Sequence, residues 1–215
     1  MTSAREDIAT EQKIVVFFDV CSSTKILEDL LSTGNIRAYR NMLIHLKKFL
    51  QESTADADME IYKFLGDGWV LFFPIHISGR RLTKMLTELS CFFQRYLEGK
   101  ISPLLQNRPD VLGLTFGVDL GPVVRIVMLN RPEYIGRPLN VAARLQGAIK
   151  DRDKKPAYKV LFTKHSFRHL DLDSNDAKLV TRSLRNIFGG ERYECMKLTL
   201  RIPAACRGST RSRHK

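Results

Sequence analysis

Hydrophobic and polar residues follow two different periods along the chain, and each period predicts one kind of element. Residues 13–20 form an apolar run, rich in β-branched and aromatic residues, that ends at Asp19 and Val20 and predicts a central buried strand. After the polar residues 21–24, which can begin a helix, apolar positions recur three and four residues apart. The same spacing predicts helices at residues 37–52, 82–96 and 139–149, the second of them ended by Gly99 and Pro103.

The other apolar runs predict strands. Residues 60–73 are typical of two strands joined by a tight turn at 65–68, because Asp-Gly between apolar runs favours a hairpin. Residues 111–129 predict a strand broken at Gly121 and Pro122, followed by a polar loop. Two further strands are expected at residues 159–163 and 192–200.

This order of elements mixes hairpins with crossover helices. We therefore expect an α+β fold in which helices cover one face of a largely antiparallel sheet. The length of 215 residues fits one domain better than two. We expect that domain at residues 13–200, between a flexible N-terminus (1–12) and a basic disordered tail (201–215).

Composition argues against a membrane protein and a zinc protein. No apolar stretch approaches the roughly 18 residues that span a bilayer, and the polar start has no signal-peptide pattern, so we expect a cytoplasmic protein. The four cysteines lie far apart and form no Cys-x-x-Cys pair, which favours neither a zinc site nor a redox motif. We expect reduced and mostly buried thiols at Cys21, Cys91, Cys195 and Cys206.

The formal charge of +12 is compatible with a nucleic-acid partner, but its distribution changes that interpretation. Five lysines and arginines, and no acidic residue, lie in residues 201–215, so the body of the chain is only moderately basic. A moderately basic body suits an anionic substrate such as a triphosphate, and equally a solvated surface with surplus lysine. Charge alone does not choose between them, and we expect no stable nucleic-acid or membrane partner.

Two aspartates are candidate metal ligands. Asp19 ends a buried strand, where a carboxylate must be paired, hydrogen-bonded or bound to metal, and Asp67 lies at the predicted hairpin tip. Carboxylates on neighbouring strands suit two hard divalent ions that act on a phosphate. Taken alone, Asp67 is better explained as an ordinary turn residue, whereas for Asp19 we favour a functional role.

Other polar residues are candidate substrate contacts. Ser22, Ser23 and Thr24 open the helix after Asp19, where free backbone N–H groups favour phosphate, although plain helix capping explains them too. Asn140 and Arg144 are four residues apart on a predicted helix and share one face, which is also the usual pattern of a solvated face.

Three segments closely resemble the signature segments of class III nucleotidyl cyclases, in the order found in that family. They are FFDVCSST at residues 17–24, KFLGD at 63–67 and GRPLNVAARL at 136–145. Three separate segments are far more specific than one motif. The resemblance implies the sheet of that family, related to the ferredoxin-like fold and covered by helices.

The resemblance also implies roles for single residues. Asp19, Asp67 and the carbonyl of Val20 would bind two divalent ions, Mn²⁺ or Mg²⁺, and residues 21–24 would contact phosphate. Asn140 would orient the ribose, and Arg144 would stabilise charge on the transition-state phosphate. Arg185 falls where the family often has a phosphate-binding lysine, although surface charge explains it better.

In this family the site lies between two head-to-tail subunits, so a homodimer with two interfacial sites is implied. Lys63, together with Glu133, would contact the base, and Tyr62 would add bulk there, unless strand alternation turns Tyr62 into the core. Lys63 with Glu133 fits neither the adenine nor the guanine set of the family. The chain also departs from it at residues 117–121, where GVDLG replaces a common Gly-x-His-x-Gly pattern.

The single-domain form and residues 62–69 and 133–138 look most like the stand-alone pyrimidine cyclases of bacterial Pycsar anti-phage systems. That likeness implies a cyclase that makes cyclic UMP or cyclic CMP, a product that activates a separate effector protein. We expect UTP as the substrate, although no residue here distinguishes uracil from cytosine. CTP and ATP remain alternative substrates. A different class of function, an inactive module that binds nucleotide or nucleic acid, also remains open.

Overall fold

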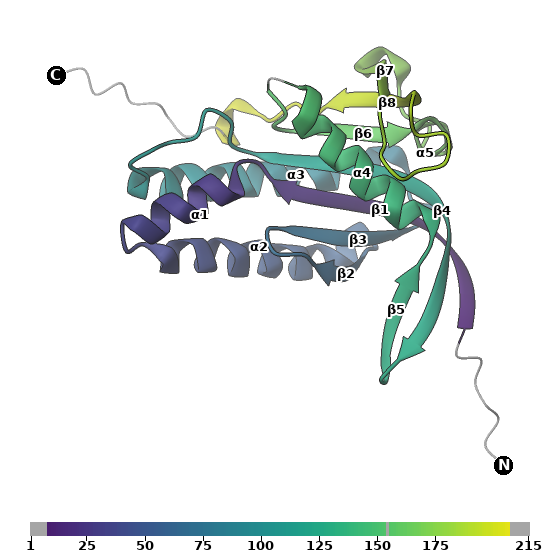
Figure 1. The fold of residues 1–215 in the computed structure, drawn as a ribbon, viewed down its shortest axis with the longest axis horizontal. Helices are drawn as coiled ribbons and strands as arrows, with labels where there is room; N and C mark the ends of the chain where they lie inside the picture. The colour runs from purple at the N-terminus through teal and green to yellow at the C-terminus, as the bar shows by residue number, and fades with distance from the viewer. Residues whose placement is uncertain (1–7, 154, 207–215) are drawn as a thin grey trace.

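The computed structural model describes residues 8–153 and 155–206 and consists of one mixed sheet with helices on both faces (Figure 1). The strands are β1 (Ile8–Val20), β2 (Glu60–Phe64), β3 (Gly68–Pro74), β4 (Leu114–Met128), β5 (Arg131–Ile135), β6 (Lys159–Thr163), β7 (Ala177–Arg182) and β8 (Tyr193–Thr199). The helices are α1 (Ser23–Ser32), α2 (Ile36–Ala57), α3 (Gly79–Tyr96), α4 (Arg137–Arg152) and α5 (Lys164–His169). The predicted α+β fold is confirmed.

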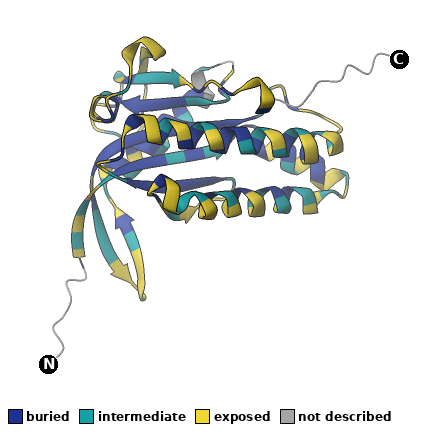
Figure 2. Cartoon of the chain, turned by 180° about the vertical axis from the view of Figure 1, so that it is seen from behind, coloured by how far each residue is buried: buried dark blue, intermediate teal, exposed yellow. Residues whose placement is uncertain are grey.

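Strand β1 lies between β3 and β4, antiparallel to both, in the sheet order β2-β3-β1-β4-β6-β8-β7. Its side chains alternate between the two faces. Ile14, Val16 and Phe18 belong to the large core beneath α1, α2 and α3, whereas Val15 and Phe17 pack with residues of α4. Figure 2 shows the buried stripes of the long helices turned toward the sheet.

Helix α4 therefore covers the face opposite to α1–α3, and the prediction of helices on one face only was wrong. The apolar run of β1 explains this, since a strand that is apolar on both sides needs cover on both sides. Helix α4 comes very close to β4 at Gly117. A Cβ there would lie 2.0 Å from the carbonyl oxygen of Ala142.

Strand β4 is continuous through Gly121 and Pro122, contrary to the predicted break. On the side away from β1, β4 pairs with β6 only at residues 115–118 and with β5 only from Val124 onward. Pro122 lies between these two partners, where a missing N–H removes no ladder bond. The expected polar loop instead contains β5.

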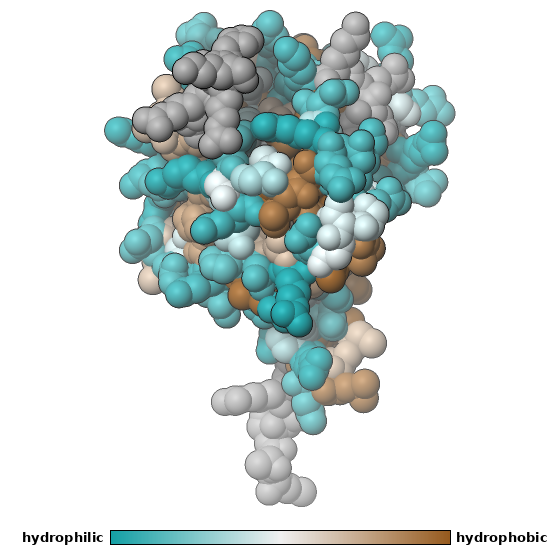
Figure 3. Space-filling view, turned by 90° about the vertical axis from the view of Figure 1, so that its left-hand side faces the viewer, coloured by the Kyte–Doolittle hydropathy of each residue, from teal (hydrophilic) through white to brown (hydrophobic). Residues whose placement is uncertain are grey.

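Strands β4 and β5 extend beyond the body as an arm, and the start of β1 pairs with β4 along its base (Figure 1). The arm carries several exposed hydrophobic residues: Val127, Met128, Leu129 and Ile135. Hydrophobic side chains are visible on the part of the molecule that projects below the body in Figure 3. Leu129, at the arm's tip, is 97% exposed.

Both ends of the folded chain differ from the predicted boundaries. Residues 8–12, expected to be flexible, form the start of β1 and pair with β4. Of the expected tail, residues 201–206 are described, with Ile202 and Cys206 buried, whereas 207–215 lie outside the described residues, as do 1–7. Helix α3 does not end at Gly99, because a π-helical turn (Leu97–Ile101) and a 3₁₀ turn (Ser102–Leu104) continue it.

The remaining predicted elements are confirmed, within a few residues at their ends. The sequence did not predict β5, β7 or α5. In the part of the chain that is described, no helix has the length and apolar character needed to cross a membrane.

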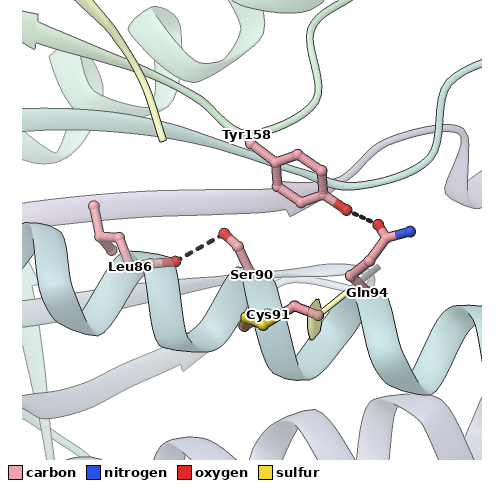
Figure 4. The surroundings of a disulfide bond; sticks show 6 residues. Leu86, Ser90, Cys91, Gln94 and Tyr158 are labelled. Atoms are coloured by element: carbon pink, nitrogen blue, oxygen red, sulfur yellow. Dashed lines mark hydrogen bonds between the residues drawn. A yellow bond between two sulfur atoms is a disulfide. The ribbon is translucent and has the colours of Figure 1, made fainter. Parts of the chain in front are cut away.

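Cys91 on α3 and Cys206 form a disulfide, with Cα atoms 5.2 Å apart (Figure 4). The expectation of four reduced cysteines was therefore wrong for this pair. The chain after β8 turns back over α3 and places the two residues at a distance that a disulfide spans. Nearby, the Tyr158 hydroxyl donates a hydrogen bond to the Gln94 side chain (Figure 4). Cys21 and Cys195 are buried thiols outside this bond.

The disulfide predicts a thiol count. Protein denatured without reductant should present two thiols to an aromatic disulfide reagent, those of Cys21 and Cys195, and four after reduction. A Cys206→Ser variant, in which the cross-link cannot form, should present three thiols under both conditions and serves as the control. Four thiols in unreduced wild-type protein would contradict the cross-link.

Candidate active site

The register of β1 with β3 brings the two candidate metal ligands to adjacent strand ends. Asp19 pairs with Gly68, the first residue of β3, and Asp67 immediately precedes Gly68 in the chain. A Cβ at Gly68 would lie 2.4 Å from the Phe18 carbonyl oxygen and 3.3 Å from Oδ1 of Asp19. Only glycine fits this approach, and Oδ1 of Asp19 faces the β3 side.

Tyr39 of α2 lies close enough to both aspartates to feel their charges. Its pKa is raised to about 12, first by burial and then by the negative charges of Asp67 and Asp19. Tyr39 is thus a buried residue of α2 on which both negative charges act. The sequence did not single out Tyr39.

The turn that follows Asp19 is held by backbone contacts. The N–H of Cys21 donates to the Gly113 carbonyl at 2.8 Å, and Ser22 adopts a left-handed conformation at the N-cap of α1. The Ser22 hydroxyl donates to the Val111 carbonyl at 2.8 Å and does not cap the helix. The capping explanation therefore fails for Ser22. Ser23 is buried and Thr24 is exposed. Phosphate binding by these residues stays a prediction.

Asp19 is also linked to the opposite side of the site. The side-chain amide of Gln146, on α4, donates to Oγ1 of Thr115 at 2.8 Å and to Oδ2 of Asp19 at 3.4 Å. Thr115 pairs with Asp19 across β1 and β4, and both Thr115 and Gln146 are buried. The two oxygens of Asp19 therefore face different partners.

Tyr62, Lys63 and Glu133, predicted to surround the base, come together between β2 and β5. The Tyr62 hydroxyl donates to Oε2 of Glu133 at 2.7 Å and accepts the N–H of Tyr134 at 3.0 Å. The Lys63 ammonium lies 3.0 Å from the same Glu133 oxygen. The Tyr62 ring stacks on Phe72, so it also belongs to the core on the α4 side.

Hydrogen bonds from Tyr62 and then Lys63 hold the pKa of Glu133 below its ordinary value, and the bond to Glu133 raises the pKa of Lys63. The contribution of Glu133 to stability is thus present above its unfolded pKa and lost as pH falls through the folded one. The Lys63 and Glu133 side chains are 47% and 35% exposed. An ion pair so exposed adds little to stability. The same exposure leaves both side chains accessible to a ligand.

Asn140 and Arg144 lie on the exposed face of α4. Arg144 and Arg185 line the same cavity, which has a volume of about 500 Å³, together with Arg182. Three guanidinium groups around one cavity suit an anion such as phosphate. Because Arg185 lines the same cavity as Arg144, its position is compatible with the phosphate role that the sequence analysis ranked second, and that role stays a prediction.

Arg182 differs from the other two arginines because it is 10% exposed and paired. Its guanidinium lies 3.2 Å from Asp153, which also binds Lys159 and Lys197. Burial raises the pKa of Asp153, but Lys197 and Lys159 hold that pKa below its ordinary value. Within the described residues, Nε of Arg182 is buried and has no hydrogen-bond partner.

Within one chain, the aspartates and the Asn140–Arg144 face are turned apart. The side of α4 that contacts the sheet carries Ala142, Leu145 and Gln146, and it is Gln146 that reaches Asp19. Asn140 and Arg144 face outward from that contact. One chain thus presents two separate groups of candidate residues.

The residues at Asp19 fit a divalent ion by their chemistry. Two carboxylates and the adjacent Val20 carbonyl offer hard oxygen ligands, on strands packed so tightly that Gly68 admits no side chain. Among residues 8–153 and 155–206, no cluster of three or more His, Cys, Asp or Glu side chains could hold a metal. A site with two carboxylates suits Mg²⁺ or Mn²⁺, which take further oxygens from substrate phosphate and water.

The chain is similar to solved structures of nucleotidyl cyclases. No family model and no curated protein match it. The adenylyl cyclase CyaB from P. aeruginosa superposes with a TM-score of 0.64 at 15% identity, over 89% of this chain and 95% of that one. The guanylyl cyclase Cya2 gives 0.64 at 15% identity, over 91% and 96%.

A bacterial light-regulated adenylyl cyclase gives a TM-score of 0.63 at 16% identity over 88% of this chain. This chain spans 51% of that longer protein. Identities at this level establish the architecture and leave the activity open. The chain has the fold of class III nucleotidyl cyclase catalytic domains.

Proposed function

We propose that this chain is a nucleotidyl cyclase that converts UTP to 3′,5′-cyclic UMP and pyrophosphate. The product would serve as a second messenger that activates a separate effector protein in anti-phage defence. The observation that supports the cyclase proposal is the pairing of Asp19 with Gly68, the residue that follows Asp67, on a fold shared with nucleotidyl cyclases. The sequence segments around both aspartates support it.

In this reaction the 3′ oxygen attacks the α-phosphorus, the bond to the β-phosphate breaks, and pyrophosphate leaves. Asp19, Asp67 and the Val20 carbonyl would hold two divalent ions, which supply positive charge to the attacking and leaving oxygens. Arg144 and Arg185 would hold the phosphates and stabilise the charge that develops on them. Asn140 would orient the ribose, so that attack is in line.

Base selection is assigned to Tyr62, Lys63 and Glu133. Polar groups that a bound ligand shields from water reject a wrong hydrogen-bonding pattern far better than an apolar wall rejects a change of size. Lys63 and Glu133, joined at 3.0 Å, would read the edge of the base. The Tyr62 ring, packed on Phe72, would limit the depth of the site, so that a pyrimidine fits and a purine does not. CTP is the first alternative substrate and ATP the second.

The active form is proposed to be a head-to-tail homodimer. Because Asn140 and Arg144 face away from Asp19 of their own chain, a second copy is needed to complete each site. The exposed hydrophobic residues on the β4–β5 arm are suited to contact with that copy. Two identical sites would result, each combining residues of both subunits.

An inactive module that only binds nucleotide or nucleic acid is the competing class. The presence of both aspartates, Asn140 and Arg144 favours an enzyme. The basic tail, which favours nucleic acid, has its residues 207–215 outside the described part of the chain. Removing that tail tests the competing class, since only nucleic-acid binding should depend on it.

The metal assignment predicts that Asp19→Ala and Asp67→Ala each abolish cyclisation. Loss of a metal ligand removes stabilisation from both reacting oxygens, so the rate should fall by several orders of magnitude. Asp56→Ala, which changes an exposed aspartate near the C-terminal end of α2, is the control and should stay active. Full activity in either site variant would falsify the assignment.

The dimer predicts complementation between two inactive variants. Asp19→Ala mixed with Arg144→Ala should recover part of the wild-type rate, because one of the two sites in a mixed dimer retains all of its residues. Turnover is measured after co-refolding, and mixed dimers are counted by native mass spectrometry. If mixed dimers form and no activity returns, the site lies within one subunit.

The base assignment predicts different results for two Tyr62 variants. Tyr62→Ala should raise the reaction with ATP relative to UTP, whereas Tyr62→Phe keeps the ring and should still exclude ATP. If Tyr62 is only a core residue, Tyr62→Ala instead lowers stability by about 3–5 kcal/mol without changing substrate preference. Product ratios measured beside melting temperatures separate the two. An unchanged ratio in a destabilised Tyr62→Ala protein excludes the pocket role.

A further inference from the structure

The side-chain amide of Gln146 is buried beside Asp19 and has no role in the reaction proposed above. Gln146 is 6% exposed and lies on α4 between Leu145 and Gly147. The side of α4 that faces the sheet and the β8 region is otherwise apolar, with Val141, Ala142, Leu145, Ala148 and Ile149. A polar side chain in such a position is costly unless its hydrogen bonds are made.

The side-chain amide of Gln146 donates two hydrogen bonds toward β1 and β4. One bond, 2.8 Å long, goes to the fully buried Thr115 hydroxyl, and a longer one, 3.4 Å, goes to Oδ2 of Asp19. The Thr115 hydroxyl in turn lies 3.5 Å from the Asp19 carbonyl oxygen. Three elements, β1, β4 and α4, thus meet at Asp19, where Gln146 contacts the carboxylate and Thr115 contacts the backbone carbonyl.

The backbone is shaped to allow this contact. Helix α4 approaches β4 so closely at Gly117 that a Cβ there would lie 2.6 Å from the backbone nitrogen of Gln146. A larger residue at 117 would push the helix away and lengthen both amide bonds. The other oxygen of Asp19, Oδ1, faces Gly68 and the strand that begins after Asp67.

We propose that Gln146 is a positioning residue that fixes the rotamer of Asp19, holding Oδ2 toward α4 so that Oδ1 is directed toward Asp67 and a shared divalent ion. Thr115 fixes the amide in turn. The donor is neutral, so Asp19 keeps its negative charge for the metal. Groups that hydrogen-bond to metal ligands in this way commonly govern metal affinity.

This inference rests on the metal site of the proposed function but not on the reaction. Its test therefore measures binding of Mn²⁺ alone, by the electron paramagnetic resonance signal of the free ion during a titration of the full chain. Gln146→Met keeps the length of the side chain and removes the donor. Its Mn²⁺ affinity should be about 10- to 100-fold weaker than that of the wild-type protein.

Leu145→Val is the matched control, because Leu145 is a buried neighbour on the same helix that packs away from Asp19. It should leave Mn²⁺ affinity unchanged even where it lowers the melting temperature. An equal loss in Leu145→Val would mean that α4 packing alone matters and would overturn the proposal. So would unchanged Mn²⁺ affinity in a folded Gln146→Met protein.

Thr115→Val tests the positioning role of Gln146 if Gln146→Met does not fold. It keeps the shape of the side chain and removes the acceptor, so it should weaken Mn²⁺ binding in the same direction, and unchanged binding would overturn the proposal. Wild-type protein that binds no Mn²⁺ overturns it as well. Wild-type protein that binds Mn²⁺ but forms no cyclic nucleotide refutes only the proposed function.

Discussion

The antiparallel pairing of β1 with β3 on one side and β4 on the other is the constraint on which the whole site depends. That register sets Asp19 opposite Gly68 and Thr115, and so places it beside Asp67 and within reach of Gln146. Because side chains alternate along a strand, a shift of one residue would turn Asp19 to the other face. The apolar side chains of β1, buried on both faces, make such a shift costly.

Helix α4 contributes residues from both its sheet-facing side and its exposed side. Its inner face packs on β1 and β4 and carries Gln146, whereas its outer face presents Asn140 and Arg144. Packing at Gly117 fixes the helix against the sheet, so the inner contact also sets the position of the outer residues. In the proposed dimer, one helix would therefore support the aspartate of one site and supply the arginine of the other.

Much of the fold was predictable because long apolar runs and regular spacing are strong signals. The elements that were not predicted lack such signals. Strand β5 is mostly exposed and pairs with β4 alone, and β7 is an edge strand, so neither has a long apolar run. Helix α5 has six residues, too few to show a helical period. The Cys91–Cys206 bond joins residues 115 positions apart, a separation at which sequence pattern carries no pairing information. Asp19, Asp67, Asn140 and Arg144 were candidates from their places in the predicted elements, whereas their specific roles, and the choice of Tyr62, Lys63, Glu133 and Arg185, came from the family resemblance. Which of these residues converge could not be derived from spacing. Gln146 had a usable signal, a single polar residue between apolar helix positions, but its partners depend on a strand register that only the structure supplies.

The proposed function requires this carboxylate site to act on a nucleoside triphosphate and to distinguish its base. The most direct test is to incubate the purified protein with each of the four ribonucleoside triphosphates and Mn²⁺ and to identify the products by mass spectrometry. We expect cyclic UMP and pyrophosphate from UTP, with little product from ATP or GTP. Cyclic AMP as the main product would contradict the pyrimidine assignment, and the absence of any cyclic nucleotide would contradict the cyclase itself.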